Sequence, residues 1–161
     1  MCLKEILRSV YNSKRLCVFL KIASHVSALI GVLAYAYILV LGYKSGLSVF
    51  LKLILFSAVP FFAVSLVRKL INSKRPYEKY DFYLEKPKEK KGQSFPSRHV
   101  FSAFIIATLM YMFSPILAWI LCAFGIVLSV ARVLLGIHFI EDVVFGALIG
   151  IFSGILAIFL I

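Results

Sequence analysis

The segment "ARVLLGIHFIEDV", residues 131–143, holds a histidine and a carboxylate that could form a catalytic pair. His138 and Asp142 are four residues apart, so on one helical turn the carboxylate can reach the imidazole. A carboxylate placed in this way fixes the tautomer of the ring and leaves its other nitrogen free to attack. Taken singly, His138 could equally be an interfacial helix cap and Asp142 a partner of a helix dipole, so the surrounding residues must decide.

A second polar group lies in "SFPSRHVFSAF", residues 94–104, directly before an apolar run. The free N–H groups at the start of a helix, together with the positive end of its dipole, form an anion site. Ser97 can donate its hydroxyl to a phosphate oxygen, and His99 lies within the first turn. This pattern predicts that an anion such as phosphate binds where the helix begins.

Four arginines stand near the ends of apolar stretches: Arg68, Arg75, Arg98 and Arg132. Arginine at a helix end can merely extend its charge to the membrane interface. A guanidinium, however, is a planar fork that suits bidentate phosphate binding. If these arginines converge with His99 and His138, they indicate a phosphate site. The elements of the fold would then have to bring these residues together.

The composition places these residues in a membrane protein. The chain has 161 residues, of which 62% are hydrophobic, and its mean hydropathy is +0.99. Roughly 20 apolar residues are needed to cross a bilayer core. Four stretches qualify: Leu16–Gly42, Leu47–Val67, Val100–Val130 and Val143–Ile161. We therefore expect an all-α, multi-pass membrane bundle that forms a single domain over residues 1–161.

The third apolar stretch is too long for one span. Extended from Ser97 to Leu135, it would make a helix of about 58 Å, nearly twice the membrane core. Proline ends helices and restricts the residue before it, so the Phe113-Ser114-Pro115 step predicts a turn. A single proline-kinked helix is the alternative, and its length argues against it. The expected spans are about 16–42, 47–70, 97–113, 115–135 and 139–161.

Five spans would put the ends of the second and fourth and the starts of the third and fifth on one side of the membrane. The polar residues brought to that side are Arg68, Arg75, Ser97, His99, Arg132, His138 and Asp142. Ionisable groups in or near a membrane are functional candidates. The topology therefore predicts one phosphate site with a histidine–carboxylate pair.

Residues 1–15 precede the first span and have a different pattern. Their apolar residues fall at helical spacing, which predicts a short amphipathic helix on the membrane surface. A cleaved signal peptide is an alternative, but the following apolar stretch is long for one and contains Lys21. On the last span, Gly146, Gly150 and Gly154 recur every four residues and predict a strip for close helix packing.

No metal or other cofactor is expected. The three cysteines, Cys2, Cys17 and Cys122, are scattered and form no CxxC pair, so we assign Cys17 and Cys122 to packing. Of the seven acids, only Glu141 and Asp142 lie near the site. Adjacent residues on a helix point about 100° apart, so this pair makes a poor magnesium cage.

Basic residues are concentrated between the second and third spans. From Arg68 to Arg98 there are ten of the 18 Lys and Arg residues and only four acids. We interpret the lysines of this loop, Lys86, Lys88, Lys90 and Lys91, as a solvated surface. Such a surface suits a cytoplasmic loop or anionic lipid headgroups. Nucleic acid is a poor fit, because the loop lacks interleaved base-stacking aromatics and adjoins the bilayer.

In three of the polar segments described above, the chain resembles the type 2 phosphatidic acid phosphatase family of membrane lipid phosphatases. That family carries three ordered motifs, K-x₆-R-P, P-S-G-H and S-R-x₅-H-x₃-D. Here they correspond to "RKLINSKRP" at 68–76, "PSRH" at 96–99 and "ARVLLGIHFIED" at 131–142. The resemblance covers roughly residues 45–161.

The chain departs from the family pattern at several positions. Arg68 stands in place of the lysine, and Lys69, one residue out of register, is a rival for its role. Arg98 replaces the glycine of the second motif but keeps its backbone N–H, and Ala131 replaces the serine of the third. The family usually has six spans, whereas five are expected here.

The resemblance implies a metal-independent phosphatase with no cofactor. His138 would attack phosphorus to form a phosphohistidine, Asp142 would hold its ring, and His99 would protonate the leaving oxygen and then help to activate water. The phosphoryl oxygens would be held by Arg68, Arg75, Ser97, Arg132 and the backbone of Arg98. Haloperoxidases share these motifs, but they are soluble and larger.

Several functional questions stay open at the level of sequence. A phosphotransferase remains an alternative, as does a non-catalytic anion or lipid transporter, although a transporter does not require the His138–Asp142 pair. Phosphatidic acid, phosphatidylglycerol phosphate and undecaprenyl diphosphate all suit an interfacial site, so the expected partners are a lipid phosphate and membrane lipids. The basic loop argues for a cytoplasmic site, yet bacterial family members commonly act on the outer face, which we expect here. The oligomeric state stays open.

Overall fold

The computed structural model describes residues 3–80 and 91–161, and all regular secondary structure in these residues is helical. The helices, in chain order, are α1 (Leu3–Asn12), α2 (Lys14–Ser45), α3 (Leu47–Ile71), α4 (Pro76–Tyr80), α5 (Arg98–Met110), α6 (Pro115–Leu134) and α7 (Ile140–Leu160). The predicted all-α bundle is confirmed. The short helix α4 was not expected from the sequence.

Four helical stretches in the described residues are long and apolar enough to cross a membrane. They are Lys14–Ser45, Leu47–Tyr80, Pro115–Leu134 and Ile140–Leu160. The third expected span, 97–113, corresponds to α5, which has only 13 residues. At 1.5 Å per residue α5 is about 20 Å long, shorter than the ~30 Å core of a bilayer. The protein is thus a multi-pass membrane protein in which the apolar helix α5 is shorter than the candidate spans around it.

Local sequence explains where the helices begin and end. Gly46, with a φ of 129°, separates α2 from α3, and Asn72 ends α3 in the left-handed conformation that asparagine tolerates. Ser114 caps α6 by accepting a hydrogen bond from the backbone N–H of Leu117 at 3.4 Å, and Pro115 opens the helix. The turn expected at residues 113–115 therefore lies where the proline predicts it.

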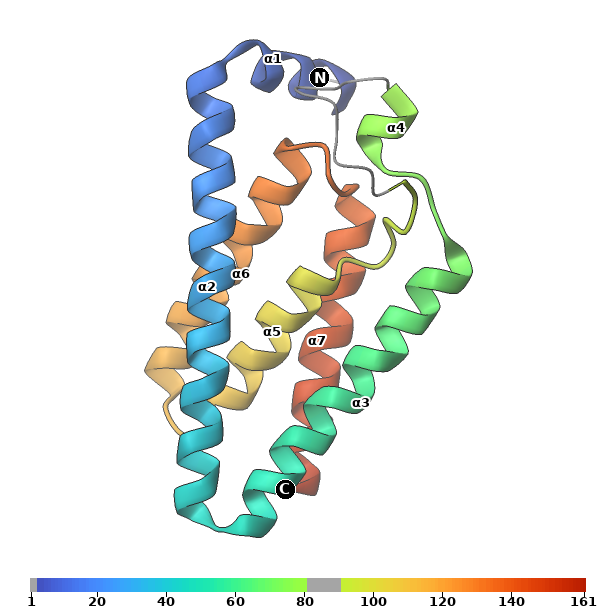
Figure 1. Ribbon diagram of the computed structural model, residues 1–161. Coiled ribbons are helices and arrows are strands. Elements are labelled where there is room, and N and C mark those ends of the chain that lie inside the picture. The colour runs from blue at the N-terminus through green and yellow to red at the C-terminus, as the bar shows by residue number, and fades with distance from the viewer. Residues whose placement is uncertain (1–2, 81–90) are drawn as a thin grey trace.

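The short helix α5 occupies the middle of the bundle, with α2, α3, α6 and α7 around it (Figure 1). Its closest neighbour is α7, which contacts it through the predicted glycine strip. A Cβ atom added at Gly146 would lie 2.7 Å from the carbonyl oxygen of Ser97, and one at Gly150 would lie 2.6 Å from that of Phe101. The backbones of α5 and α7 are therefore in direct contact, with no layer of side chains between them.

Two apolar clusters hold the bundle together. The larger one joins α2, α3, α5, α6 and α7 through residues that include Ile38, Leu53 and Phe101. The smaller one joins α1, α2 and α6 through Val10, Cys17, Leu20, Ala131 and Leu135. Cys17 is buried in this second cluster, as its assignment to packing predicted, and Cys122 is half-buried.

The amphipathic helix expected near the N-terminus is present as α1, and it packs beside the loop that follows α6. Leu7 and Val10 are buried on its apolar side. The hydroxyl of Tyr11 donates a hydrogen bond to the carbonyl oxygen of Leu135 at 3.1 Å. Burial raises the pKa of Tyr11 to about 12, so the hydroxyl keeps its proton for this bond. Helix α1 therefore braces the chain just before His138.

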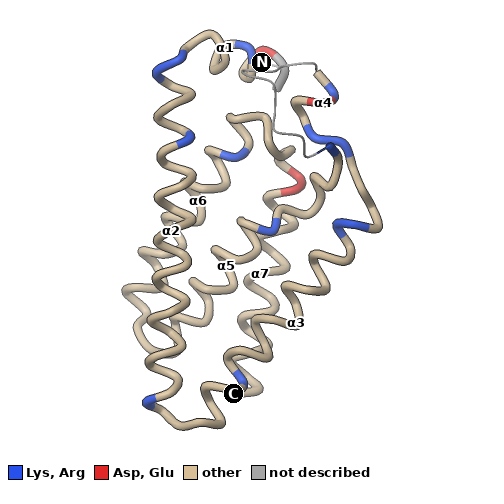
Figure 2. The backbone as a smooth tube through the Cα atoms, viewed as in Figure 1, with Lys and Arg blue, Asp and Glu red and all other residues tan. Residues whose placement is uncertain are grey.

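Charged residues gather at one end of the bundle, around α1, α4 and the ends of α3 and α6 (Figure 2). At the opposite end, Lys44 is in the last turn of α2, and Nζ of Lys52 donates to the carbonyl oxygen of Leu160 at 3.2 Å near the C-terminus. Between the two ends, large apolar side chains such as Phe62, Trp119 and Phe152 are exposed. This distribution suits a bundle whose sides face lipid. Lys86, Lys88 and Lys90 lie outside the described residues, and Lys91 is exposed.

Candidate active site

The polar residues predicted from the helix ends converge on one cavity of about 430 Å³ at the charged end of the bundle. Its lining consists of Arg68, Arg75, Lys91, Gly92, Gln93, Arg98, His99, Arg132 and His138. Ser97 and Asp142 are buried and bonded to each other through their backbones, with the N–H of Ser97 donating to the carbonyl oxygen of Asp142 at 3.0 Å. No carboxylate is among the described residues that line the cavity, so its wall is cationic.

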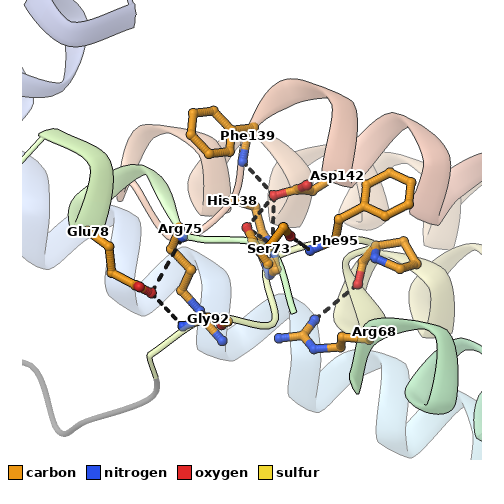
Figure 3. A network of polar contacts seen from close by, with 11 residues as sticks. Arg68, Ser73, Arg75, Glu78, Gly92, Phe95, His138, Phe139 and Asp142 are labelled. Carbon is orange, nitrogen blue, oxygen red and sulfur yellow. Dashed lines mark hydrogen bonds and ion pairs between the residues drawn. The ribbon is translucent and has the colours of Figure 1, made fainter. Parts of the chain in front are cut away.

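His138 and Asp142 form the expected pair, but not on one helical turn. His138 lies in the loop after α6, two residues before α7 begins, because Gly136 turns the chain with a φ of 64°. Asp142 is in the first turn of α7, and its Oδ2 lies 3.4 Å from Nδ1 of His138 (Figure 3). The same oxygen accepts the backbone N–H of Phe139 at 2.8 Å, which fixes the carboxylate at the helix start.

The side chain of His138 is only 2% exposed. Burial lowers its pKa, because the charged form loses hydration, while the hydrogen bond that the ring donates to Asp142 acts in the opposite direction. Arg75 and Arg68 add to the lowering by repelling a second positive charge. The ring is therefore neutral near pH 7, as a nucleophile must be.

Ser94 contacts both members of this pair and was not singled out from the sequence. Its hydroxyl donates a hydrogen bond to Oδ2 of Asp142 and lies 3.5 Å from Nδ1 of His138. Nothing in the spacing of the motifs marks Ser94, which stands 48 residues before Asp142 and 44 before His138. Only the fold brings the three side chains together.

Arg68 is the first-motif residue that faces the cavity. Its side chain is 6% exposed, and Nη1 donates to the carbonyl oxygen of Pro96 at 3.0 Å. Lys69 follows it on the helix but is exposed and does not line the cavity. Adjacent residues on a helix point in different directions, so only one of the two can enter the site. The geometry favours Arg68 over its rival.

Arg75 links the two segments that close the cavity on the side of α4. Its Nε donates to the carbonyl oxygen of Gly92 at 3.1 Å, and the N–H of Gly92 donates to Glu78 Oε1 at 2.7 Å. A Cβ at Gly92 would lie 2.4 Å from Oδ1 of Asn72, and its φ is 70°, so glycine is needed there. The chain before α5 is thus fastened to the chain after α3.

The first turn of α5 presents two side chains to the cavity. His99 is exposed within it, whereas Arg98 is half-buried and turned toward α3. Nη1 of Arg98 lies 3.5 Å from Oγ of Ser65, and its guanidinium carbon is 5.9 Å from the centre of the Phe61 ring. The side chain of Arg98 therefore has partners of its own, while its backbone N–H stays at the helix start.

Three buried polar atoms lack a hydrogen-bond partner within the described part of the chain: Arg68 Nε, Ser97 Oγ and Arg132 Nε. They come from α3, from the residue before α5 and from α6, and all three belong to residues predicted to bind phosphate. Leaving a buried donor without a partner is costly, so such atoms are normally satisfied. An oxyanion in the cavity would supply acceptors.

A second cavity of about 400 Å³ adjoins the first and shares Arg98 and His99 with it. Its remaining lining is mostly apolar and comes from α2, α3, α5 and α6. Residues that represent these helices are Val32, Phe61, Ile106 and Leu128.

As for metals, residues 3–80 and 91–161 contain no group of three or more His, Cys, Asp or Glu side chains that could hold an ion.

A sequence model of the PAP2 superfamily matches residues 28–160. The chain belongs to the PAP2 superfamily. The resemblance inferred from the three motifs is thereby confirmed, and in this PAP2 protein those motifs meet at one cavity.

Two solved structures are similar to this chain. The PAP2-type phosphatidylglycerolphosphate phosphatase of Bacillus subtilis is 20% identical, with a TM-score of 0.70 over 98% of this chain and 83% of that one. LpxE of Aquifex aeolicus is 26% identical, with a TM-score of 0.72 over 96% of this chain and 93% of that one. None of the curated proteins matches the chain at a significant level.

Proposed function

We propose that this PAP2 protein is a membrane phosphohydrolase that removes phosphate from a lipid phosphate or diphosphate through a phosphohistidine. The observation that carries the proposal is the set of three unpartnered buried donors, on Arg68, Ser97 and Arg132, in and beside the cavity that His138 lines. A phosphoryl group that accepts from these donors would lie in the same cavity as the imidazole. The similarity to a phosphatidylglycerolphosphate phosphatase supports the same class of reaction.

The chemistry begins with the neutral imidazole of His138. Its Nδ1 faces Asp142, so Nε2 is the atom left to attack phosphorus. As the N–P bond forms, the bond from phosphorus to the leaving oxygen breaks, and that oxygen takes a proton from His99. Water, deprotonated by His99, then attacks phosphorus, releases inorganic phosphate and restores His138.

The cationic wall of the cavity stabilises charge while these bonds change. The guanidiniums of Arg68, Arg75 and Arg132 hold the phosphoryl oxygens, with Ser97 and the backbone N–H of Arg98 as further donors. Fixed donors aimed at developing charge typically supply a large part of the rate enhancement.

In this mechanism the arginines neutralise the charge that magnesium neutralises in other phosphoryl-transfer enzymes, so excess chelator should leave turnover unchanged. Loss of turnover in chelator and its return with magnesium would contradict this.

The adjoining apolar cavity supports a lipid substrate over a soluble phosphate ester. It borders His99 and Arg98 at one end and is lined by α2, α3, α5 and α6 elsewhere. A hydrocarbon chain lying there would bury apolar surface and place its phosphate beside the general acid. A soluble phosphate ester would leave this cavity unused.

The experiment that tests the function is a side-by-side assay of purified lipid phosphates in detergent. Wild-type protein should release inorganic phosphate from at least one of phosphatidic acid, phosphatidylglycerol phosphate and undecaprenyl diphosphate, and His138→Ala should release none. Phosphate that moves to an acceptor other than water would identify a phosphotransferase. Binding without any dephosphorylation in wild type would identify a transporter.

We further propose that the site faces the outside of the cell. The basic residues at its end of the bundle would ordinarily favour the cytoplasm, but several of them line the cavity and are needed for phosphate. Lys91 is exposed beside the site, so Lys91→Cys in a background without the native cysteines reports its side. An impermeant thiol reagent should label it in intact cells. Labelling only after lysis would reverse the assignment.

A further inference from the structure

The hydroxyl of Ser94 stands between the carboxylate and the imidazole of the proposed catalytic pair. Ser94 is fully buried, and it is not among the residues that line the cavity. Its Oγ donates to Oδ2 of Asp142 and lies 3.5 Å from Nδ1 of His138, which is itself 3.4 Å from the same Oδ2. The three polar atoms therefore form a closed triangle, and of the three residues only His138 lines the cavity.

The positions of the protons in this triangle determine which ring nitrogen of His138 is unprotonated. An ionised carboxylate only accepts, so the single hydroxyl proton of Ser94 goes to Asp142. The oxygen of Ser94 can then only accept from Nδ1 of His138. Both neighbours of Nδ1 are thus acceptors, which requires Nδ1 to carry the proton and leaves Nε2 unprotonated.

The backbone holds Ser94 in this position. Its N–H donates to the carbonyl oxygen of Ser73 at 2.9 Å. The next N–H, of Phe95, donates to Oγ of Ser73 at 2.9 Å (Figure 3). Two hydrogen bonds therefore fix the segment on which the hydroxyl is carried. The backbone that carries the Ser94 hydroxyl is therefore part of the connection between the chain after α3 and the chain before α5.

We propose that Ser94 is a positioning residue that, with Asp142, holds His138 in the Nδ1–H tautomer with Nε2 free. A single acceptor 3.4 Å away leaves the ring poorly restrained, and a second acceptor on the same nitrogen defines both its tautomer and its plane. The inference rests on the proposed function in taking His138 as the nucleophile. The tautomer itself is a property of the resting protein and can be measured without any substrate.

The first test is nuclear magnetic resonance of protein labelled with ¹⁵N-histidine. The chain has three histidines, so the His138 signals are identified by their loss in His138→Ala. At a pH where the ring is neutral, wild type should show the Nδ1–H tautomer, and Ser94→Ala should show a mixture. Ser94→Thr, which keeps the hydroxyl, should retain the wild-type signals.

The matched control is Ser57→Ala, which removes another buried hydroxyl, bonded to Tyr35 at 2.6 Å and to the carbonyl oxygen of Leu53 at 2.8 Å. It should leave the His138 signals unchanged. An unchanged tautomer in Ser94→Ala, or the Nε2–H tautomer in wild type, would overturn the proposal.

The second test is kinetic. Ser94→Ala should lower kcat by roughly 10–100-fold, the range for losing a hydrogen bond to a charged group. Because Ser94 does not line the cavity, KM should stay close to that of wild type, and Ser94→Thr should recover most of the rate. A raised KM with kcat unchanged would place Ser94 in substrate binding and overturn the positioning role. If wild type hydrolyses no lipid phosphate, the proposed function fails, and the tautomer measurement still decides the role of Ser94.

Discussion

The site contains two groups of polar residues that differ in whether their atoms already have partners. In the histidine cluster (Ser94, His138 and Asp142), every side chain bonds to another member. In the donor cluster (Arg68, Ser97 and Arg132), each side chain has a buried atom without a partner in the described residues. The first cluster is complete before substrate arrives, whereas the second is completed by an oxyanion. We infer that orientation of the nucleophile is built into the fold and that charge neutralisation waits for the phosphoryl group.

The largest expected effect comes from breaking the histidine cluster at its centre. His138→Ala removes the nucleophile while the donor cluster stays intact, so turnover should fall to background while lipid phosphate still binds. Phosphate release and binding of a labelled lipid phosphate measure the two properties separately. His25→Ala, on the exposed surface of α2, is the matched control and should behave as wild type. Labelled phosphate recovered on any residue other than His138 after rapid acid-free quenching would refute the assignment.

The second effect comes from the donor cluster. Arg68→Ala and Arg132→Ala each remove a charged donor, so kcat/KM should fall by roughly 10²–10³-fold, the range for losing one fixed donor to a developing oxyanion. The ring of His138 keeps its partners in both variants, so its tautomer should not change. Lys69→Ala, next to Arg68 but exposed, should stay within about twofold of wild type. A larger loss in Lys69→Ala than in Arg68→Ala would reverse the choice between them.

A smaller effect is expected from Asp142→Asn, together with a shift in pH dependence. The ring is still held by Ser94 and by the loop, so kcat should fall by only roughly 10–100-fold. In wild type, burial lowers the pKa of His138, so the acid limb of phosphoenzyme formation should lie below the ordinary histidine value of about 6.5. Asp142 raises this pKa, so its neutralisation should move the acid limb to still lower pH. Titration of the substrate is the same with both proteins, so it does not affect the comparison. An acid limb that moves to higher pH in Asp142→Asn would contradict the model in which Asp142 is a charged partner of His138.

The smallest effect is expected outside both clusters. The guanidinium of Arg98 is engaged with Ser65 and Phe61, and only its backbone N–H is assigned to phosphate. Arg98→Gly restores the family residue and keeps that N–H, so kcat/KM should change by less than about threefold. Glycine near a helix start costs up to ~1 kcal/mol relative to better helix formers, so the melting temperature should fall slightly. A loss as large as that of Arg68→Ala would add Arg98 to the donor cluster.

The sequence predicted the helices well because their signals are local. Long apolar runs define the spans, and Gly46, Asn72 and Pro115 stand where helices begin or end. Helix α4 was missed because its five residues lie in a charged segment without apolar periodicity. The length of α5 was overestimated, since nothing at Met110 marks its end.

The site was predicted in outline, because one topology brings the ends of four helices together. The hydrogen bonds that complete it were not predictable from the sequence. Ser94 meets Asp142 over 48 residues, and Glu78 meets Gly92 over 14, and neither distance along the chain belongs to a motif. The His138–Asp142 contact was expected from helical spacing, yet it forms because a loop approaches the start of α7. The structure brings the predicted residues together, but through a local geometry that differs from the one expected.

The direct backbone contact of α5 with α7 limits how the protein can adapt during its reaction. Ser97 stands at the start of α5 and Asp142 at the start of α7, and the carbonyl oxygen of Ser97 rests on Gly146. Side chains between helices can change rotamer to absorb a shift, but two touching backbones cannot. We therefore expect the two helices to move together, so that room for a larger substrate comes from displacement of α2, α3 or α6, which also line the apolar cavity. The size of the substrate can then change through these helices while the spacing of the reacting groups stays constant.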